Sequence, residues 1–343
     1  MATKRQKLFL IFFLSKASLF GLGYSLMFSL SGKDTWISVL FGTFIGTSIV
    51  FMISKIMNNK QNIDINRYLE KNYIIKILLI ILSCYFILEE LTTLTNFMTS
   101  FYLLKTPNYV IGVCSIIVTL YIVNKGLNSI LRASEIIFYI TLFMIISSLL
   151  ILLTYTKTIH LLPVLTTPPK PLFKSSIIFS LYTTIPLINL LNLENNGKKI
   201  ILSYILTNIT IVIITLAILG IFGSSLTKII RFPEYIVLKR IKILSFIEKI
   251  ENILSITYIY DNLFLMIFSA YTVKNIIKNK IVYYMIIIST LLFTIIFINN
   301  NYIYALNNYY LTPYIFSIGL IIIIILYIKA QKKKPKLQIQ RDT

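Results

Sequence analysis

Four ionisable side chains lie deep inside long apolar stretches of the sequence: Lys16, Glu89, Glu90 and Asp261. A charged group in such a setting costs roughly 2.5–3.5 kcal/mol on membrane-insertion scales, so each one requires a partner or a water-filled cavity. Lys16 follows Leu8 by roughly 12 Å at about 1.5 Å per helical residue, which is deeper than a lysine comfortably snorkels. A pair between Lys16 and either Glu89 or Asp261 would remove much of the penalty. Such a pair either fixes helix packing alone or belongs to a substrate or proton site.

Polar side chains repeat at helical spacing around these acids. Glu89 is followed by Thr92, Thr93 and Asn96, and a later stretch carries Glu251, Ser255, Tyr258, Asp261 and Asn262. Residues three or four apart share one helix face, so each stretch presents a polar stripe toward the interior of a helical bundle. The two stripes either support a ligand cavity or join neighbouring helices through hydrogen bonds.

Two further stretches contain residues that interrupt helices. Gly21-Leu22-Gly23 permits backbone distortion, and Pro186, which follows Thr183 and Thr184, removes an amide and clashes with the preceding turn. Freed amides and carbonyls in a protein-lined cavity can hold a carboxylate or a cation, as in the discontinuous helices of many transporters. The simpler interpretations are close packing at the glycines and a kink at the proline.

The sequence lacks the motifs of several other classes of protein. It has no phosphate-binding glycine loop, zinc motif or nucleophile elbow, so we predict neither an enzyme nor a cofactor. His160 is the single histidine, and Cys84 and Cys114 both lie in apolar runs, which argues against a metal site or a disulfide. The net charge of +21 would suggest nucleic acid in a soluble protein, but the placement of the charges indicates a membrane instead.

The composition requires lipid as the solvent. Apolar residues make up 57% of the 343 residues and charged residues only 13%, which leaves too little polar surface for a water-soluble fold. A span needs about 20 mainly apolar residues, so the chain accommodates about ten. We predict an all-α integral membrane protein with spans at 8–30, 35–57, 77–101, 109–124, 134–156, 173–192, 200–222, 252–273, 281–299 and 310–328.

The predicted layout is a single polytopic membrane domain over 1–343. Basic residues favour the side that holds both termini, which predicts a cytoplasmic N-terminus (1–7), a transmembrane bundle (8–328) and a basic cytoplasmic tail (329–343). An external loop at 223–251 contains a predicted interfacial helix that opens at Pro233, for contact with either a partner protein or the lipid surface. The segment 166–171 (TTPPKP) divides the chain into five and five spans, as in an inverted-repeat transporter.

Several phrases, in order, resemble the endospore germination permeases, the GerAB-type membrane subunits of nutrient germinant receptors, within the amino acid-polyamine-organocation superfamily. GKDTWIS at 32–38 is similar to the family's G-x-D-x-W-I-S, and KGLNSILRASEI at 125–136 is similar to its G-L-x-x-I-x-R-x-x-E. Thr106-Pro107, LLPV at 161–164, Phe232-Pro233, Arg240 and FIEKIE at 246–251 resemble further family phrases. The phrases keep their register across most of the chain.

The resemblance implies a LeuT-like fold with a 5+5 inverted repeat and discontinuous helices 1 and 6. It also implies an amino acid or similar nutrient as ligand, a spore inner-membrane or cell-membrane location, and A- and C-type partner subunits. The sequence departs from the family pattern where YSLM at 24–27 replaces the Leu-Pro after the glycines. It departs again where YTTIP at 182–186 lacks an acidic residue and where Lys249 replaces an arginine.

We therefore predict a receptor subunit that binds a small nutrient at the two breaks. Its ligand-binding residues are Gly21, Leu22, Gly23, Thr183, Thr184 and Pro186, and its cavity charges or coupling groups are Lys16, Glu89, Glu90 and Asp261. Thr92, Thr93, Asn96 and Tyr258 form the supporting polar face. Two alternatives stay open: a proton- or sodium-coupled amino acid permease, and a non-transporting membrane scaffold whose buried charges only hold helices together.

Overall fold

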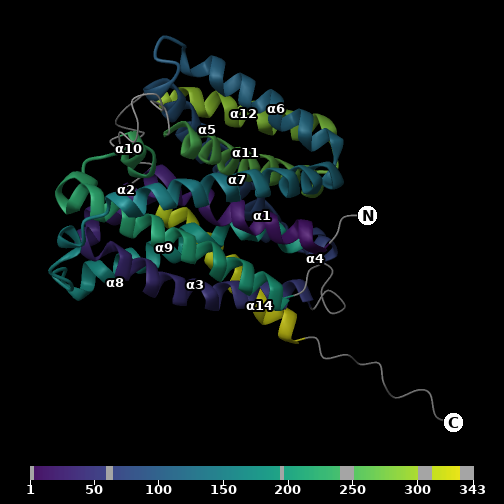
Figure 1. The fold of residues 1–343 in the computed structure, drawn as a ribbon. Helices are drawn as coiled ribbons and strands as arrows, with labels where there is room; N and C mark the ends of the chain where they lie inside the picture. Colours follow the sequence, from purple (N-terminus) through teal and green to yellow (C-terminus); the bar gives the residue numbers. More distant parts are fainter. Residues whose placement is uncertain (1–3, 59–64, 194–196, 240–250, 300–310, 333–343) are drawn as a thin grey trace.

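The computed structural model describes residues 4–58, 65–193, 197–239, 251–299 and 311–332. Within these ranges the chain is helical, with turns and no strand. The long helices lie side by side and run in roughly the same direction across the bundle (Figure 1). α1 begins and α14 ends at the same end of the bundle (Figure 1), so the first and last described helices share one side. The loop residues 240–250, the last predicted external loop at 300–310 and the tail after Lys332 lie outside the described residues.

Each of the ten predicted spans coincides with helix. The first half contains α1 (Lys4–Ala17), η1 (Leu19–Gly23), α2 (Tyr24–Ser31), η2 (Gly32–Asp34), α3 (Thr35–Asn58), α4 (Ile65–Lys71), α5 (Tyr73–Phe101), α6 (Asn108–Lys125), α7 (Leu127–Tyr155) and η3 (Thr158–Leu161). The second half contains α8 (Pro169–Thr184), η4 (Ile185–Asn192), α9 (Gly197–Thr227), α10 (Pro233–Lys239), α11 (Glu251–Ile276), α12 (Lys280–Asn299) and α14 (Thr312–Lys332). The short helix α4 had no counterpart in the sequence prediction.

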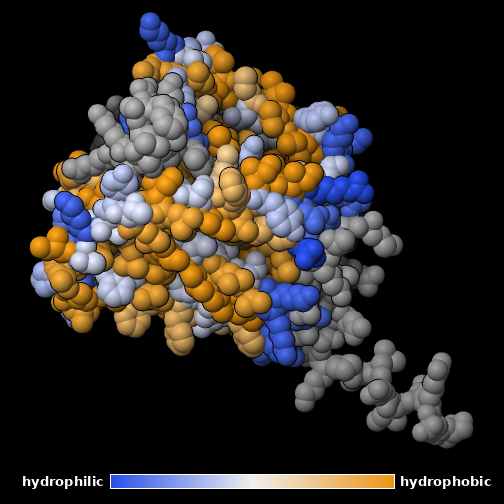
Figure 2. All heavy atoms as spheres, viewed as in Figure 1, coloured by the Kyte–Doolittle hydropathy of each residue, from blue (hydrophilic) through white to orange (hydrophobic). Residues whose placement is uncertain are grey.

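The surface is that of an integral membrane protein. Among the described residues, 6 helices are long and apolar enough to cross a membrane: Tyr24–Asn58, Asn108–Lys125, Leu127–Tyr155, Pro169–Leu191, Gly197–Thr227 and Thr312–Gln331. Large apolar side chains such as Phe44 (76% exposed) and Phe143 (74% exposed) face outward, as lipid contact requires. Figure 2 shows hydrophobic residues along the flanks and hydrophilic residues gathered at the end where the chain begins. The count of ten spans and the 5+5 repeat stay predictions.

α1 lies at the centre of the bundle. Its residues from Leu10 to Leu14 are at most 5% exposed, so the helix is buried on all sides, and it packs against α7, α8, α9 and α11. Around it, α3 packs closely on α8 and α9, and α5 packs on α11. Gly42 allows the close approach of α3 to α8, because a Cβ atom there would lie 2.6 Å from Phe179 Cδ1.

The helix interruptions predicted in the first and sixth stretches are present. η1 is a five-residue π-helix, and η4 is a 3₁₀-helix that begins one residue before Pro186. Proline cannot donate to the preceding turn, so the α-helix ends at Thr184. Both segments remain helical instead of unwinding into extended chain.

A buried carboxylate joins the turn between α2 and α3 by hydrogen bonds to the loop that precedes α8. Asp34 is fully buried and accepts hydrogen bonds from Leu165 N (2.8 Å), Thr167 N (2.7 Å) and Thr166 Oγ1 (3.2 Å). Thr167 Oγ1 donates in return to Ser31 O at 2.8 Å. The turn itself needs Gly32, whose φ of 51° is strained for other residues. The segment that divides the two halves of the chain is thus held against the turn between α2 and α3.

We expect Asp34→Asn to lower the free energy of unfolding by roughly 1.5–3 kcal/mol, because one carboxylate oxygen is replaced by an amide group that faces N–H donors. Thermal unfolding of the purified protein in detergent measures the change. Lys33→Gln is the matched control, since it removes only one exposed hydrogen bond, from Lys33 Nζ to Leu162 O. Equal stability of the two variants would contradict the role assigned to Asp34.

Candidate functional site

The four buried ionisable residues come from α1, α5 and α11, which meet in the core. Lys16 Nζ lies 3.0 Å from Asp261 Oδ2, and both side chains are 0% exposed. Of the two partners that the sequence allowed for Lys16, the structure thus selects Asp261. The ammonium group also lies 4.0 Å from the centre of the Phe12 ring and 5.6 Å from that of Phe20, where aromatic faces stabilise a cation.

Glu90 of α5 reaches the same region. Its Oε1 atom accepts a hydrogen bond from Ser18 Oγ at 2.9 Å, and the carboxyl group interacts electrostatically with Asp261. Its Oε2 atom is buried and has no hydrogen-bond partner among the described residues. The sequence patterns did not single out Ser18. Its position, directly before the Gly21–Gly23 break, was the available signal.

Glu89 faces the second helix break. It is 1% exposed, and its carboxyl group interacts electrostatically with Glu90 and with Tyr182 of α8. Its Oε2 atom, like that of Glu90, is buried without a hydrogen-bond partner in the described part of the chain. Tyr182, which the sequence reasoning missed, lies against the first break as well, because a Cβ atom on Gly23 would come within 3.0 Å of its ring. Its position in the sequence, one helical turn before Pro186, was the signal that could have identified Tyr182 as a candidate site residue.

The charges of this cluster do not balance. Three carboxyl groups and one ammonium group, all at most 1% exposed, would leave two net negative charges if every group were ionised (one positive minus three negative). An uncompensated charge in a membrane interior is expensive, so the cluster favours an additional cation. A proton, a metal cation or the ammonium group of a ligand would each supply that charge.

The two predicted ligand-binding threonines contact neighbouring helices in this conformation. Thr183 Oγ1 lies 2.7 Å from Tyr204 OH and 3.0 Å from Phe179 O, and Thr184 Oγ1 donates to Ser180 O at 2.6 Å. Pro186 is buried at the start of η4. Gly21 and Leu22 lie within η1, which contacts α8 directly. The first break therefore lies against α8, the helix that ends at the second break, and the threonine hydroxyls bond to protein groups.

The supporting polar face joins α5 to α11 at one point. Thr93 Oγ1 donates to Asn262 Oδ1 at 2.9 Å, whereas Thr92 bonds to the carbonyl of Glu89 on its own helix. Asn96 is half-buried, and its Nδ2 atom has no partner in the described ranges. Tyr258 is 3% exposed, with its ring centre 4.7 Å from that of Phe97. One of the four residues thus bridges the two stripes directly.

Asn189 links the second break to both polar helices, which sequence patterns did not predict. Its Oδ1 atom accepts from Ser83 Oγ of α5 at 3.3 Å, and its Nδ2 atom donates to Ser269 Oγ of α11 at 3.0 Å. Asn189 is 3% exposed in η4. An asparagine three residues after a membrane proline was the only local sign. A movement of η4 would therefore change its hydrogen bonds with α5 and α11.

Aromatic side chains close the end of the bundle above Tyr258. In α10, Tyr235 has its ring centre 4.5 Å from that of Phe101 and 5.2 Å from that of Phe97. Phe232, directly before α10, lies 5.9 Å from Tyr258. α10 begins at Pro233, where the sequence predicted an interfacial helix, and it packs on α9 and α11. The buried charges are thus covered from this side.

We expect the ion pair to behave as a unit. Asp261→Asn should destabilise the protein by roughly 3–5 kcal/mol, because it leaves the buried ammonium group of Lys16 without its negatively charged partner. The double change Lys16→Met with Asp261→Asn should recover most of that loss. Thermal unfolding in detergent tests the difference. Additive losses in the double variant would contradict the coupling.

Comparison with known proteins identifies the family to which the sequence is similar. A family model described as "Spore germination protein" matches residues 3–303. Spore germination protein KB of Bacillus subtilis (strain 168) is 24% identical over 266 residues, which cover 72% of this chain and 71% of that protein. The putative spore germination protein YfkT of the same organism is 22% identical over 244 residues, or 68% and 67% of the two chains. The family consists of receptor and permease components and not of enzymes. The match over most of its length shows that this chain belongs to the spore germination protein family.

Proposed function

We propose that this chain is the nutrient-binding membrane subunit of a germinant receptor, and that it binds a small amino acid beside the helix breaks at Gly21–Gly23 and Pro186. The observation that carries the proposal is the unbalanced cluster of Lys16, Glu89, Glu90 and Asp261 next to both breaks. An amino acid would bring an ammonium group for the excess carboxylates and a carboxylate for backbone amides at the breaks.

In this proposal the described conformation is the closed one. Tyr182 lies against Gly23, so a ligand must displace Tyr182 or η4 to enter beside the breaks. Because Asn189 joins η4 to α5 and α11, ligand entry would alter contacts on both polar helices. That rearrangement would pass to A- and C-type partner subunits in the spore inner membrane. The proposed orientation has both termini in the cytoplasm and a LeuT-like inverted repeat.

We expect Glu89→Gln and Glu90→Gln each to abolish or strongly weaken the stabilisation that amino acids give the purified protein. A neutral amide cannot compensate an ammonium group, so each change removes the attraction. The measurement is a thermal-shift screen across the amino acids. Glu135→Gln, whose carboxylate accepts from Gln6 in α1 and lies apart from the cluster, is the matched control and should keep the full shift.

The same variants should delay germination when they replace the natural chain in spores. An absence of any amino acid shift in the natural protein, together with normal germination of the Glu89→Gln and Asp261→Asn variants, would refute the proposed site. That result would favour a membrane scaffold whose buried charges only hold helices together.

A second candidate is a proton- or sodium-coupled amino acid permease. The buried Oε2 atoms of Glu89 and Glu90, which lack hydrogen-bond partners among the described residues, favour it, because such groups take up protons or cations readily. Uptake into proteoliposomes separates the two candidates. The receptor proposal predicts binding without accumulation of labelled amino acid, and accumulation driven by an ion gradient would replace it with the permease.

A further inference from the structure

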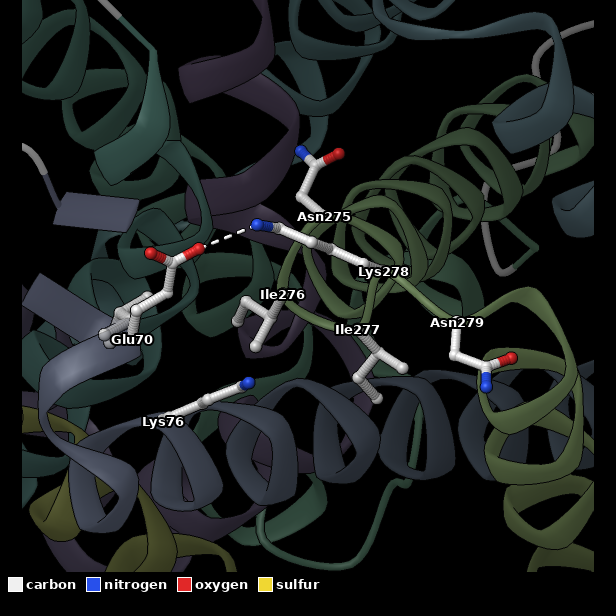
Figure 3. A pocket seen from close by; sticks show the side chains of 8 residues that line it. Glu70, Lys76, Asn275, Ile276, Ile277, Lys278 and Asn279 are labelled. Atoms are coloured by element: carbon white, nitrogen blue, oxygen red, sulfur yellow. Dashed lines mark hydrogen bonds and ion pairs between the residues drawn. The ribbon is translucent and has the colours of Figure 1, made fainter. Parts of the chain in front are cut away.

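A cavity of about 450 Å³ lies far from the buried charges, at the end of the bundle where α1 begins. It is formed by α4, the start of α5 and the connection between α11 and α12 (Figure 3). Its lining residues are Leu69, Glu70, Lys76, Asn275, Ile276, Ile277, Lys278 and Asn279. The proposed nutrient site uses none of them.

The charged groups of the cavity leave one cation uncompensated. Lys278 Nζ lies 2.7 Å from Glu70 Oε1, in a pair whose side chains are 83% and 55% exposed. Lys76 is half-buried, and no hydrogen bond or ion pair joins its ammonium group to another described residue. Figure 3 shows Lys76 and Lys278 entering the cavity from α5 and from the α11–α12 connection, with Glu70 beside Lys278. The lining therefore carries one net positive charge.

Neutral donors add to this preference for an anion. Asn279 precedes α12, and its Oδ1 atom accepts a hydrogen bond from Ile281 N at 2.9 Å, while its amide N–H groups have no partner among the described residues. The first turn of α12 begins at Lys280, where backbone N–H groups and the helix dipole favour negative charge. Lysines, a side-chain amide and a helix start together match the chemistry of a phosphate group.

Apolar surface runs from the cavity along the two helices that flank it. In α5, Ile74 is 76% exposed and Ile77 is 54% exposed, and in α12, Ile281 is 71% exposed and Met285 is 58% exposed. α5 and α12 pack against each other, and Ile74 and Ile281 each lie two residues from a residue that lines the cavity. A polar cavity with exposed apolar residues on both flanking helices suits a molecule with a phosphate head and acyl chains better than a soluble anion.

We infer that this cavity binds the phosphate head group of an anionic phospholipid, held by Lys76 and Lys278, with its acyl chains along the seam between α5 and α12. Glu70 competes with the phosphate for Lys278. Lipid binding would thus connect α4 and the α11–α12 connection to the membrane, independently of any nutrient.

The test measures stabilisation of the purified full chain in detergent by added phosphatidylglycerol, against phosphatidylcholine of the same acyl chains. Phosphatidylglycerol should stabilise more. Lys76→Gln and Lys278→Gln should each weaken its apparent affinity by about fivefold, as expected for one basic group near an anionic head group. Lys125→Gln, at the same end of the bundle but outside the cavity, is the matched control and should behave as the natural protein.

Glu70→Gln separates lipid binding from a merely structural ion pair. Both Glu70→Gln and Lys278→Gln break the pair, but only the former removes a competitor, so it should tighten phosphatidylglycerol binding. Three results would each overturn the inference: equal stabilisation by the two lipids, natural affinity in the Lys76→Gln and Lys278→Gln variants, or weakened binding in Glu70→Gln. Equal stabilisation by soluble glycerol 3-phosphate would also overturn it and would assign the cavity to a free phosphate compound.

Discussion

The buried ion pair between Lys16 and Asp261 is the interaction on which the rest of the bundle depends. It joins α1, the helix that is buried on every side, to α11, in a place where no solvent screens the charges. Opposite charges are tolerated there only together, because either one alone carries a desolvation penalty of several kcal/mol. The pair therefore sets the depth and rotation of α1. It thereby also places η1, which begins at Leu19, beside α8.

The remaining carboxyl groups divide between the two helix breaks. Glu90 bonds to Ser18 at the end of α1, and Glu89 interacts with Tyr182 at the end of α8. Adjacent residues of one helix thus face the breaks in two others. The side-chain hydrogen bonds of Asn189 connect η4, at the second break, to α5 and α11. A change of charge at either acid would act on the geometry of a break, which is how a small cation can influence helix packing in a membrane.

Much of the fold could be predicted because lipid leaves a chain few choices. Long apolar stretches in a membrane must satisfy their backbone groups internally, so each predicted span coincides with helix. The interruptions were predictable as well, since Pro186 lacks the amide that an α-helix requires. Local patterns could not predict the bonds of Asn189 or the contact of Tyr182 with Gly23. Both contacts join distant segments, and hydrogen-bond partners across helices leave no periodic trace in one sequence.

The sequence by itself determined the class of the protein, the positions of its long helices and the identity of the four charges deep in apolar stretches, because these follow from hydropathy and from the chemistry of single residues. Only the tertiary structure decided that Lys16 pairs with Asp261 and not with Glu89, and that the first break lies against Tyr182 of α8. The tertiary structure alone also showed the cavity of Lys76 and Lys278, which lies at the C-terminal end of α11, away from Asp261. These features depend on the rotation and depth of each helix relative to its neighbours, which packing settles and composition does not.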